Sequence, residues 1–266
     1  MGATGPRVAG SAVSSHLAVV EVTAPAKLTL GLRVIGVRGD GYHLIDAEMV
    51  SLEWADTLTI DPAGSHLSAD GPFAAGMPLD GSNLVAKALV LAGRSASVHL
   101  HKAIPHGGGL GGGSSDAAAV LRWAGYTDVV GASRLGADVS FCLVGGRARV
   151  RGIGELVETL EQRPLDITLV VPPLVESTPA VYRAWDELGG PRAHGPNDLE
   201  PAALLVQPLL ARWRDRITEA TGVAPTLAGS GAAWFLVGHH SLAAALPEAT
   251  VVQTRTDRQQ HAAGGR

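Results

Sequence analysis

The chain has 266 residues, of which 46% are hydrophobic and 17% charged, so it is long enough for one large or two modest globular domains. A net charge of −4 and an aromatic content of 4% argue against nucleic acid as a partner. No apolar run approaches the roughly 18–20 residues that cross a bilayer, and the single cysteine, Cys142, excludes an internal disulfide and reads as a core residue. We therefore expect a cytoplasmic protein with neither a membrane nor a nucleic acid as partner.

The first third of the sequence is rich in predicted strands. Apolar or alternating runs predict strands at residues 16–22, 27–35, 44–54 and 57–60, with a turn at residues 38–41. A Gly-, Pro- and Asp-rich stretch at residues 61–82 predicts a loop or an irregular hairpin. A helix is expected at residues 83–93, because Asn83 is a good N-cap and Gly93 a good stop signal.

The next segment, residues 105–119, reads Pro-His-Gly-Gly-Gly-Leu-Gly-Gly-Gly-Ser-Ser-Asp-Ala-Ala-Ala. It follows a predicted strand at residues 97–104 and precedes helix-forming residues at 117–123. Glycines allow consecutive backbone N–H groups to face a polyanion, and the start of a helix attracts the same charge. The segment therefore predicts a binding loop for a nucleotide triphosphate or another phosphorylated ligand.

Two other interpretations of this segment are weaker. A flexible linker would not be expected to carry Leu110 at its centre, between a strand and a helix. The spacing of the glycines matches neither the P-loop motif nor the dinucleotide-binding motif with its later acidic residue, which disfavours those two folds.

Two charged residues are candidates for chemistry beside this loop. Only three of the 21 basic residues are lysines, and Lys27 begins an apolar strand, whereas chance explains Lys87 and Lys102 equally well. Asp138 opens an apolar run, where its carboxylate could be a helix N-cap, one half of an ion pair or a catalytic base; position alone favours the cap. His99 and His101 have a spacing that could bind metal, but no convincing third ligand follows.

From residue 164 the pattern predicts a second α+β unit. Strands are expected at residues 166–171, 233–237 and 250–254, and helices at 179–188, within 198–221 and at 241–246. A further Gly-rich turn occupies residues 229–232. A phosphate loop, a lysine, an aspartate and a second glycine turn are the kinds of part that phosphoryl transfer needs.

Several motifs together resemble the galactokinase, homoserine, mevalonate and phosphomevalonate (GHMP) kinase superfamily, over roughly residues 20–255. They are Ala24-Pro25-Ala26-Lys27-Leu28, Asp40-Gly41-Tyr42-His43, Asn83-Leu84, the loop from Gly107 to Asp116, Leu135-Gly136-Ala137-Asp138-Val139, Thr178-Pro179 with Tyr182, Asn197-Asp198-Leu199-Glu200 and Gly229-Ser230-Gly231. The nearest resemblance is to the branch that acts on a cytidine diphosphate-linked methylerythritol.

This resemblance implies an α+β protein with the two-domain GHMP kinase fold. Residues 1–155 would form an N-terminal ATP-binding domain with a mixed sheet, and residues 156–266 a C-terminal ferredoxin-like domain, with the site in the cleft between them. The implied reaction is ATP- and Mg²⁺-dependent phosphorylation of the substrate's 2-hydroxyl, a step of the non-mevalonate route to isoprenoid precursors. We expect a monomer or a weak homodimer.

The resemblance also implies site residues. Asp138 would accept the hydroxyl proton, and Lys27 would stabilise the aspartate and offset phosphoryl charge. The triphosphate would be bound by Asn83, Pro105, Gly107, Gly108, Gly109, Leu110, Gly111, Gly112, Gly113, Ser114, Ser115 and Asp116. The substrate would contact Thr29, Tyr42, His43, Thr178, Tyr182, Gly229, Ser230 and Gly231. Among these, Tyr42, His43, Thr178 and Tyr182 would form the pocket for its cytidine base. Ser115 is the one candidate protein ligand for magnesium.

Three departures from the family pattern leave alternatives open. The segment between Asp116 and Asp138 is short, Thr29 stands where asparagine is usual, and Ser140 stands where proline is usual. A nucleotide-binding regulatory or scaffolding protein that has lost turnover is therefore a second hypothesis. A GHMP kinase acting on another small alcohol is a third.

Overall fold

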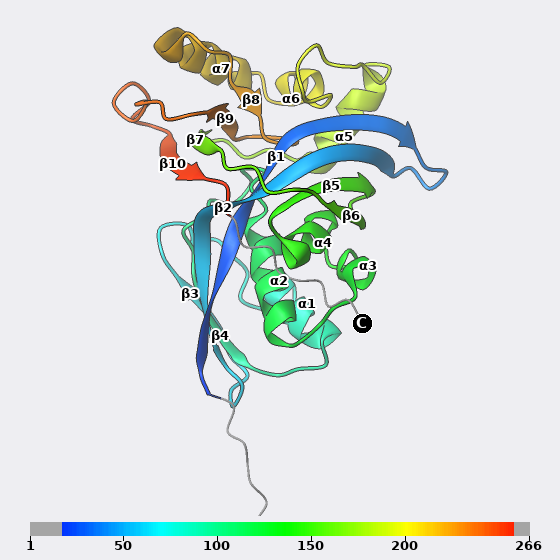
Figure 1. Cartoon of the computed structure of the whole chain (residues 1–266), viewed down its shortest axis with the longest axis vertical. Helices are drawn as coiled ribbons and strands as arrows, with labels where there is room; N and C mark the ends of the chain where they lie inside the picture. Colours follow the sequence, from blue (N-terminus) through cyan, green and yellow to red (C-terminus); the bar gives the residue numbers. More distant parts are fainter. Residues whose placement is uncertain (1–17, 258–266) are drawn as a thin grey trace, which may run out of the picture.

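The computed structural model describes residues 18–257, so the first two residues of the strand predicted at 16–22 lie outside the described part. In this part no helix is both long and apolar enough to span a membrane. The secondary structure falls into two sheets, each with helices packed against it (Figure 1). This is the expected α+β class with a mixed first sheet.

The first sheet has six strands, built around two long ones. β1 (Val20–Val37) pairs antiparallel with β2 (His43–Asp61) along nearly its whole length, so the predicted strands in this region merge into two. The other edge of β2 pairs with β4 (Ser97–His101) near its end and with β5 (Arg147–Gly152) near its beginning. β3 (Leu67–Asp70) runs parallel to β4, and β6 (Leu156–Thr159) pairs with β5.

Four helices belong to this first unit: α1 (Leu84–Leu91), α2 (Gly112–Trp123), α3 (Val129–Ala132) and α4 (Ala137–Val144). The α2 helix is buried over seven consecutive residues, 115–121, and contacts α1, α4 and β1. Three of those seven are alanines, whose small side chains allow neighbouring elements to approach from every side. The glycine-rich loop therefore leads into the centre of the unit.

The second sheet has four antiparallel strands in the order β10-β7-β9-β8. They are β7 (Asp166–Val171), β8 (Thr226–Leu227), β9 (Trp234–Val237) and β10 (Thr250–Arg255), and the helices α5 (Thr178–Glu187), α6 (Glu200–Val206) and α7 (Leu209–Thr221) lie between β7 and β8 in the chain. In chain order the strands stand 4-1-3-2, as in a ferredoxin-like sheet. Figure 1 shows these helices at the end of the molecule away from β3 and β4.

The helix predicted at residues 241–246 is wrong. The segment consists of turns, in which the N–H groups of Ala245 and Leu246 both reach the carbonyl of Leu242. Leu242 and Leu246 are buried and account for the helix-like apolar spacing. Pro247 follows at once, and a proline disfavours helical backbone at the residue before it.

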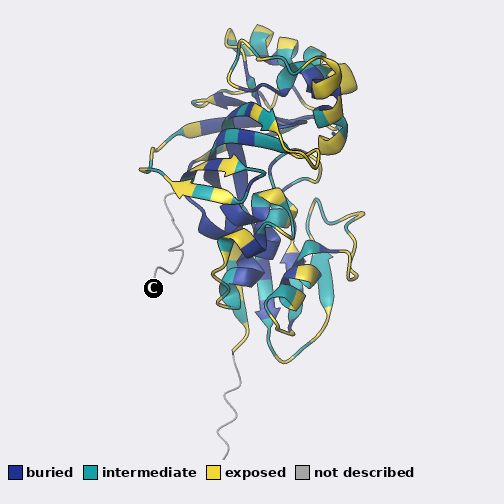
Figure 2. Ribbon diagram, turned by 90° about the vertical axis from the view of Figure 1, so that its right-hand side faces the viewer, coloured by how far each residue is buried: buried dark blue, intermediate teal, exposed yellow. Residues whose placement is uncertain are grey.

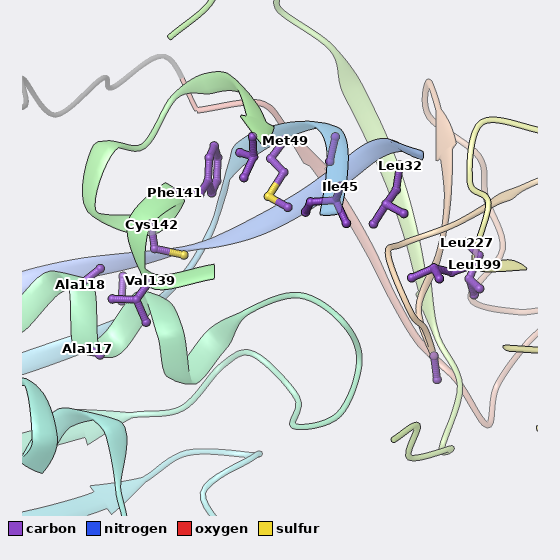
Figure 3. Packing of buried hydrophobic residues seen from close by; sticks show 14 of the residues in the cluster. Leu32, Ile45, Met49, Ala117, Ala118, Val139, Phe141, Cys142, Leu199 and Leu227 are labelled. Atoms are coloured by element: carbon purple, nitrogen blue, oxygen red, sulfur yellow. The ribbon is translucent and has the colours of Figure 1, made fainter. Parts of the chain in front are cut away.

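One hydrophobic cluster spans both units. Figure 3 shows Ala117 and Ala118 of α2 with Val139 and Cys142 of α4, and Leu32 of β1 on the side of the cluster that includes Leu199 and Leu227. Figure 2 shows that burial is greatest in the middle of the molecule, while the helices at the far end expose much of their surface.

The division into residues 1–155 and 156–266 stays a prediction. Because β6 pairs with β5, residues 156–159 share a sheet with the first unit. Isolated bridges from Leu32 to Asn197 and from Leu52 to Thr256 then fasten the second unit to the two long strands of the first.

Candidate active site

The glycine-rich loop between β4 and α2 is shaped by glycines at alternate positions. Gly107, Gly109 and Gly111 have φ values of +70°, +72° and +66°, a left-handed region that residues with a Cβ rarely adopt. Leu110 between two of them is only 1% exposed and packs into a hydrophobic cluster. The buried leucine anchors the loop, so the segment has a defined conformation and is not a flexible linker.

This loop lies directly against the glycine turn of the second unit. A Cβ on Gly109 would be 2.6 Å from the carbonyl oxygen of Ala228 and 2.7 Å from that of Gly231. The N–H of Ala232 donates to the carbonyl of Gly107 at 3.3 Å, and the N–H of Ala233 donates to that of Gly108 at 3.2 Å. The two glycine segments, far apart in the sequence, therefore form one wall.

Lys27 and Asp138 meet beside this wall. Lys27 Nζ is 3.2 Å from Asp138 Oδ2 and donates a hydrogen bond to Thr29 Oγ1 at 3.3 Å. A Cβ on Gly111 would lie 2.6 Å from Lys27 Cγ, and one on Gly229 would lie 3.8 Å from Lys27 Nζ. An ammonium, a carboxylate, a hydroxyl and both glycine segments thus converge at one point.

Local structure explains how these side chains come together. Lys27 follows a register shift between β1 and β2, and its N–H donates to the carbonyl of Leu110, which ties β1 to the loop. Gly136 occupies the N-cap of α4, so Asp138 lies in the first helical turn and the N-cap hypothesis for it is wrong. A carboxylate there interacts favourably with the helix dipole. The Asp138 side chain is 31% exposed against 6% for Lys27, so the carboxylate is accessible to a ligand.

Two residues assigned to the triphosphate or its metal are turned away from the loop. The Ser115 hydroxyl donates to the carbonyl of Pro25 at 2.7 Å and is buried, so it does not fit the expected magnesium ligand. Asp116 is 2% exposed and pairs with Lys102 at 2.5 Å, which leaves its side chain no access to a nucleotide. Ser114, one position earlier, is partly exposed, and its hydroxyl has no hydrogen-bond partner among residues 18–257.

Beneath the loop, Lys102 bridges the buried carboxylates of Asp56 and Asp116. Asp56 Oδ1 also accepts the N–H groups of Ala103 and Ile104, directly before the loop, at 2.6 and 2.9 Å. Burial raises the pKa of Asp116 to about 7, with Lys102 acting in the opposite direction. The sequence showed only that Lys102 is one of few lysines. The resemblance assigned Asp116 to the triphosphate, and nothing indicated that Asp116 and Asp56 share Lys102.

The expected base-binding residues form two groups and an outlier. The His43 ring lies 4.6 Å from the Tyr182 ring and 5.6 Å from that of Trp185, while its Nε2 is 2.8 Å from Asp186 Oδ1. Thr178 Oγ1 is hydrogen-bonded to Ser230 Oγ at 2.8 Å, beside the second glycine turn. Tyr42 is 59% exposed, and its ring contacts the Arg38 guanidinium instead.

Asn83 is the N-cap of α1, as its sequence context predicted. Its side-chain oxygen accepts the N–H of Val85 at 2.8 Å, and its amide donates to the carbonyl of Pro78 at 2.7 Å. Both polar ends are therefore satisfied within the protein. Gly112 and Gly113 begin α2, and Pro105 leads into the loop.

Asn197 has a positional role that its motif alone did not reveal. Its amide donates to the carbonyls of Leu227 and Gly229 at 2.9 and 2.6 Å, while its oxygen accepts the N–H of Leu199 at 3.0 Å. These bonds hold the second glycine turn where it meets Lys27. A buried amide that bridges two backbone segments leaves no signal in a sequence beyond its residue type.

The three departures from the family pattern have local explanations. The short segment before Asp138 contains the four-residue α3, and the contact between Lys27 and Asp138 is made nevertheless. The Ser140 hydroxyl donates to the carbonyl of Val129 at 2.7 Å, so it connects α4 to α3. Thr29 is buried beside Lys27 and accepts its hydrogen bond.

The remaining candidates belong to the scaffold. His99 and His101 both lie near Asp70, with His101 Nδ1 at 2.7 Å, and no group of three or more suitable side chains that could hold a metal occurs within residues 18–257. Cys142 is buried in the core, and burial raises the pKa of its thiol to about 12.

Comparison with known proteins identifies similar kinases. Residues 83–146 match the family model of the GHMP kinases N terminal domain. The chain is 39% identical over 236 residues to 4-diphosphocytidyl-2-C-methyl-D-erythritol kinase of Paracoccus denitrificans (strain Pd 1222), covering 80% of this chain and 84% of that protein. The chain belongs to the 4-diphosphocytidyl-2-C-methyl-D-erythritol kinase family.

Further relatives of this kinase family give the same result. The corresponding kinase of Jannaschia sp. (strain CCS1) is 38% identical, over 80% of this chain and 86% of that protein. A crystal structure of 4-(cytidine 5'-diphospho)-2C-methyl-D-erythritol kinase superposes with a TM-score of 0.71 at 33% identity, covering 90% of this chain and all of that one. Homoserine kinase from Cytophaga hutchinsonii ATCC 33406 shares the fold at a TM-score of 0.59 and 16% identity, covering 93% and 97%.

Proposed function

We propose that this chain transfers the γ-phosphoryl group of ATP to the 2-hydroxyl of 4-diphosphocytidyl-2-C-methyl-D-erythritol, in the cytoplasm. One observation carries the proposal: the 3.2 Å contact between Lys27 and Asp138 beside the glycine-rich loop. The relatives that carry the name 4-diphosphocytidyl-2-C-methyl-D-erythritol kinase align with at least four fifths of this chain, which supports the choice of substrate.

In the proposed reaction, the Asp138 carboxylate accepts the proton of the 2-hydroxyl as its oxygen attacks the γ-phosphorus. An oxygen–phosphorus bond forms, the bond from the γ-phosphorus to the β,γ-bridging oxygen breaks, and ADP leaves with that oxygen. Lys27 offsets the negative charge that spreads over the moving phosphoryl group. Backbone N–H groups of residues 107–114 and the start of α2 hold the remaining phosphates.

The substrate would lie between the two glycine segments and α5. We propose that its phosphate-linked portion contacts Thr29 and the turn formed by Gly229, Ser230 and Gly231. Thr178 supports this turn through its hydrogen bond to Ser230. We assign the cytidine base to the His43 and Tyr182 pair, because an aromatic face and a polar edge meet there.

Magnesium is the metal that phosphoryl transfer ordinarily requires, and it prefers oxygen ligands, retaining water and phosphate oxygens. The donor set fits. The unpartnered, partly exposed hydroxyl of Ser114 lies at the start of α2, and a Cβ on Gly136, next to the Asp138 helix, would be 3.9 Å from its Oγ. Ser114 would hold the ion together with the nucleotide, and the ion would neutralise phosphate charge.

The deciding experiment is a turnover assay with ATP and substrate on the purified chain. Replacing Asp138 by Asn removes the proton acceptor but keeps the shape, so kcat should fall by about 10²–10⁴-fold while ATP binding persists. Lys27→Ala should also lower kcat. Asp215→Asn, on the exposed surface of α7, is the matched control and should turn over like wild type.

Each alternative has its own outcome in this assay. A wild-type chain that binds ATP but is as inert as its variants would support the scaffolding hypothesis. Asp138→Asn turnover equal to wild type would show that Asp138 is not the base. Inhibition by mevalonate, without competition from cytidine diphosphate compounds, would indicate another small alcohol as substrate.

A further inference from the structure

His43 is held by one face of α5. The contacting side chains are Tyr182, Trp185 and Asp186, whose spacing of three and four residues places them on the same side of a helix. Tyr182 and Trp185 pack against the ring at interplanar angles of 34° and 84°, and Asp186 Oδ1 lies 2.8 Å from Nε2. The His43 side chain is only 10% exposed, so its ring has little room to turn.

The Asp186 contact determines which ring nitrogen carries hydrogen. An ionised carboxylate can only accept hydrogen bonds, so a neutral His43 must carry its proton on Nε2. The other nitrogen, Nδ1, then presents a lone pair. Within residues 18–257, Nδ1 has no hydrogen-bond partner.

We propose that Asp186 is a positioning residue that makes His43 select the base of the substrate. This inference rests on the proposed function, because it assumes that the cytidine end binds at His43. An acceptor at Nδ1 attracts an amino group on the edge of a base, as in cytosine, and repels a carbonyl oxygen in the same place, as in uracil. Asp186, which nothing in the sequence singled out, thereby sets the preference for an amino-bearing pyrimidine.

The test compares the binding of CDP and UDP to the full chain by calorimetry, without turnover. Wild type should bind CDP at least about tenfold more tightly, because the uracil carbonyl would leave two acceptors facing each other. Asp186→Ala frees both tautomers of His43, so the ratio of the two dissociation constants should shrink by about the same factor. Asp186→Glu retains a carboxylate and should restore part of the preference.

Glu187→Ala is the matched control, since Glu187 is the exposed neighbour on α5 and makes no contact with His43. It should leave the CDP-to-UDP ratio unchanged. In turnover, Asp186→Ala should raise KM for the substrate with little change in kcat. Nitrogen-15 NMR of histidine-labelled protein should show His43 Nδ1 without a proton in wild type and a tautomer mixture in Asp186→Ala.

Two results would overturn the inference and can be told apart. If wild type turns over but the Asp186 variants keep its CDP-to-UDP ratio, Asp186 has only a structural role and the kinase function stands. If wild type neither prefers CDP nor phosphorylates the substrate, the proposed function fails together with the inference.

Discussion

Gly111 is a position where only glycine fits, for two separate reasons. Its φ of +66° strains any residue with a Cβ, and that Cβ would lie 2.6 Å from Lys27 Cγ, near the base of the catalytic side chain. Because the clash is not with a mobile side-chain tip, either Lys27 or the loop has to move. A displacement of about 1 Å at a reacting group can cost about a hundredfold in rate.

We therefore expect Gly111→Ala to lower the free energy of unfolding by about 1–3 kcal/mol and to reduce kcat strongly. The stability is measured by urea denaturation. Gly113→Ala provides the comparison, because Gly113 lies in α2, is exposed and has only Leu84 Cδ1 near its Cβ position, at 3.8 Å. Alanine favours a helix, so this second variant should be as stable as wild type or more so. Equal losses in both variants would contradict the explanation.

At the scale of the elements, buried charged groups connect β2, the end of β4 and α2, in addition to apolar packing. Lys102 lies between Asp56 and Asp116, all three almost fully buried, and Asp116 Oδ1 has no hydrogen-bond partner. Two carboxylates share one ammonium there, so a proton on Asp116 relieves an excess negative charge. Burial raises the pKa of Asp116 from its ordinary 3.8 to about 7; the nearby Asp56 charge acts in the same direction and Lys102 in the opposite one.

The raised pKa predicts a direction for the pH dependence of stability. Between pH 3.8 and about 7 the folded chain holds a proton that the unfolded chain releases, so this contribution is complete below 3.8 and is lost as the pH rises through about 7. Asp116→Asn cannot ionise. Its unfolding free energy relative to wild type should therefore increase from pH 5 to pH 8.

Urea titrations of both proteins at several pH values measure this difference. Asp215→Asn, exposed on α7, serves as the control and should leave the pH slope unchanged. A constant gap between wild type and Asp116→Asn across this range would show that Asp116 is ionised in the folded protein throughout.

The sequence predicted elements well where the pattern was local. Asn83 caps α1 as expected, because capping depends on a few neighbouring residues. The helix expected from residues 117–123 was also found, although α2 begins earlier, at Gly112. The four-residue β3 was not predicted, since it is defined by pairing with β4 and has little pattern of its own. The false helix at 241–246 arose because two buried leucines four residues apart mimic a helical face.

The residues of the candidate site also fall into those that the sequence could predict and those that it could not. Lys27, Asp138 and the loop glycines could be named in advance, because family motifs mark them and their residue types fit the chemistry. The orientation of Ser115 and Asp116 could not, since adjacent helical residues differ by about 100° in direction and only packing decides which ones are buried. The partners of His43 likewise come from a helix more than a hundred residues away.

At the scale of the whole molecule, Asp198 joins the second unit to β1. Its carboxylate is buried and accepts bonds from Arg33 Nη1 at 2.7 Å, from the N–H of Val34 at 3.1 Å and from the N–H of Ala193 at 3.0 Å. Removing it would leave two backbone donors and a guanidinium without their acceptor. Buried donors left unsatisfied are costly in free energy.

Asp198→Ala should therefore lower the free energy of unfolding by about 3 kcal/mol, measured by urea denaturation. Asp40→Ala breaks another Arg–Asp pair, the one with Arg38, but both of its side chains are roughly half exposed. Exposed pairs contribute little, so that variant should unfold almost like wild type. A similar loss in both proteins would mean that the position of Asp198 between the two units is unimportant.

The second unit is fastened to the long hairpin at two places. Asn197 and Asp198 hold it to β1 near Leu32, while Thr256 bridges to Leu52 and the N–H of Asp257 donates to the carbonyl of Ser51. Two such seams oppose an opening that separates the second unit from either long strand, because the hydrogen bonds of that seam would break. We therefore expect ligands to enter and leave by movements of short local segments, with little change in the relative orientation of the two sheets.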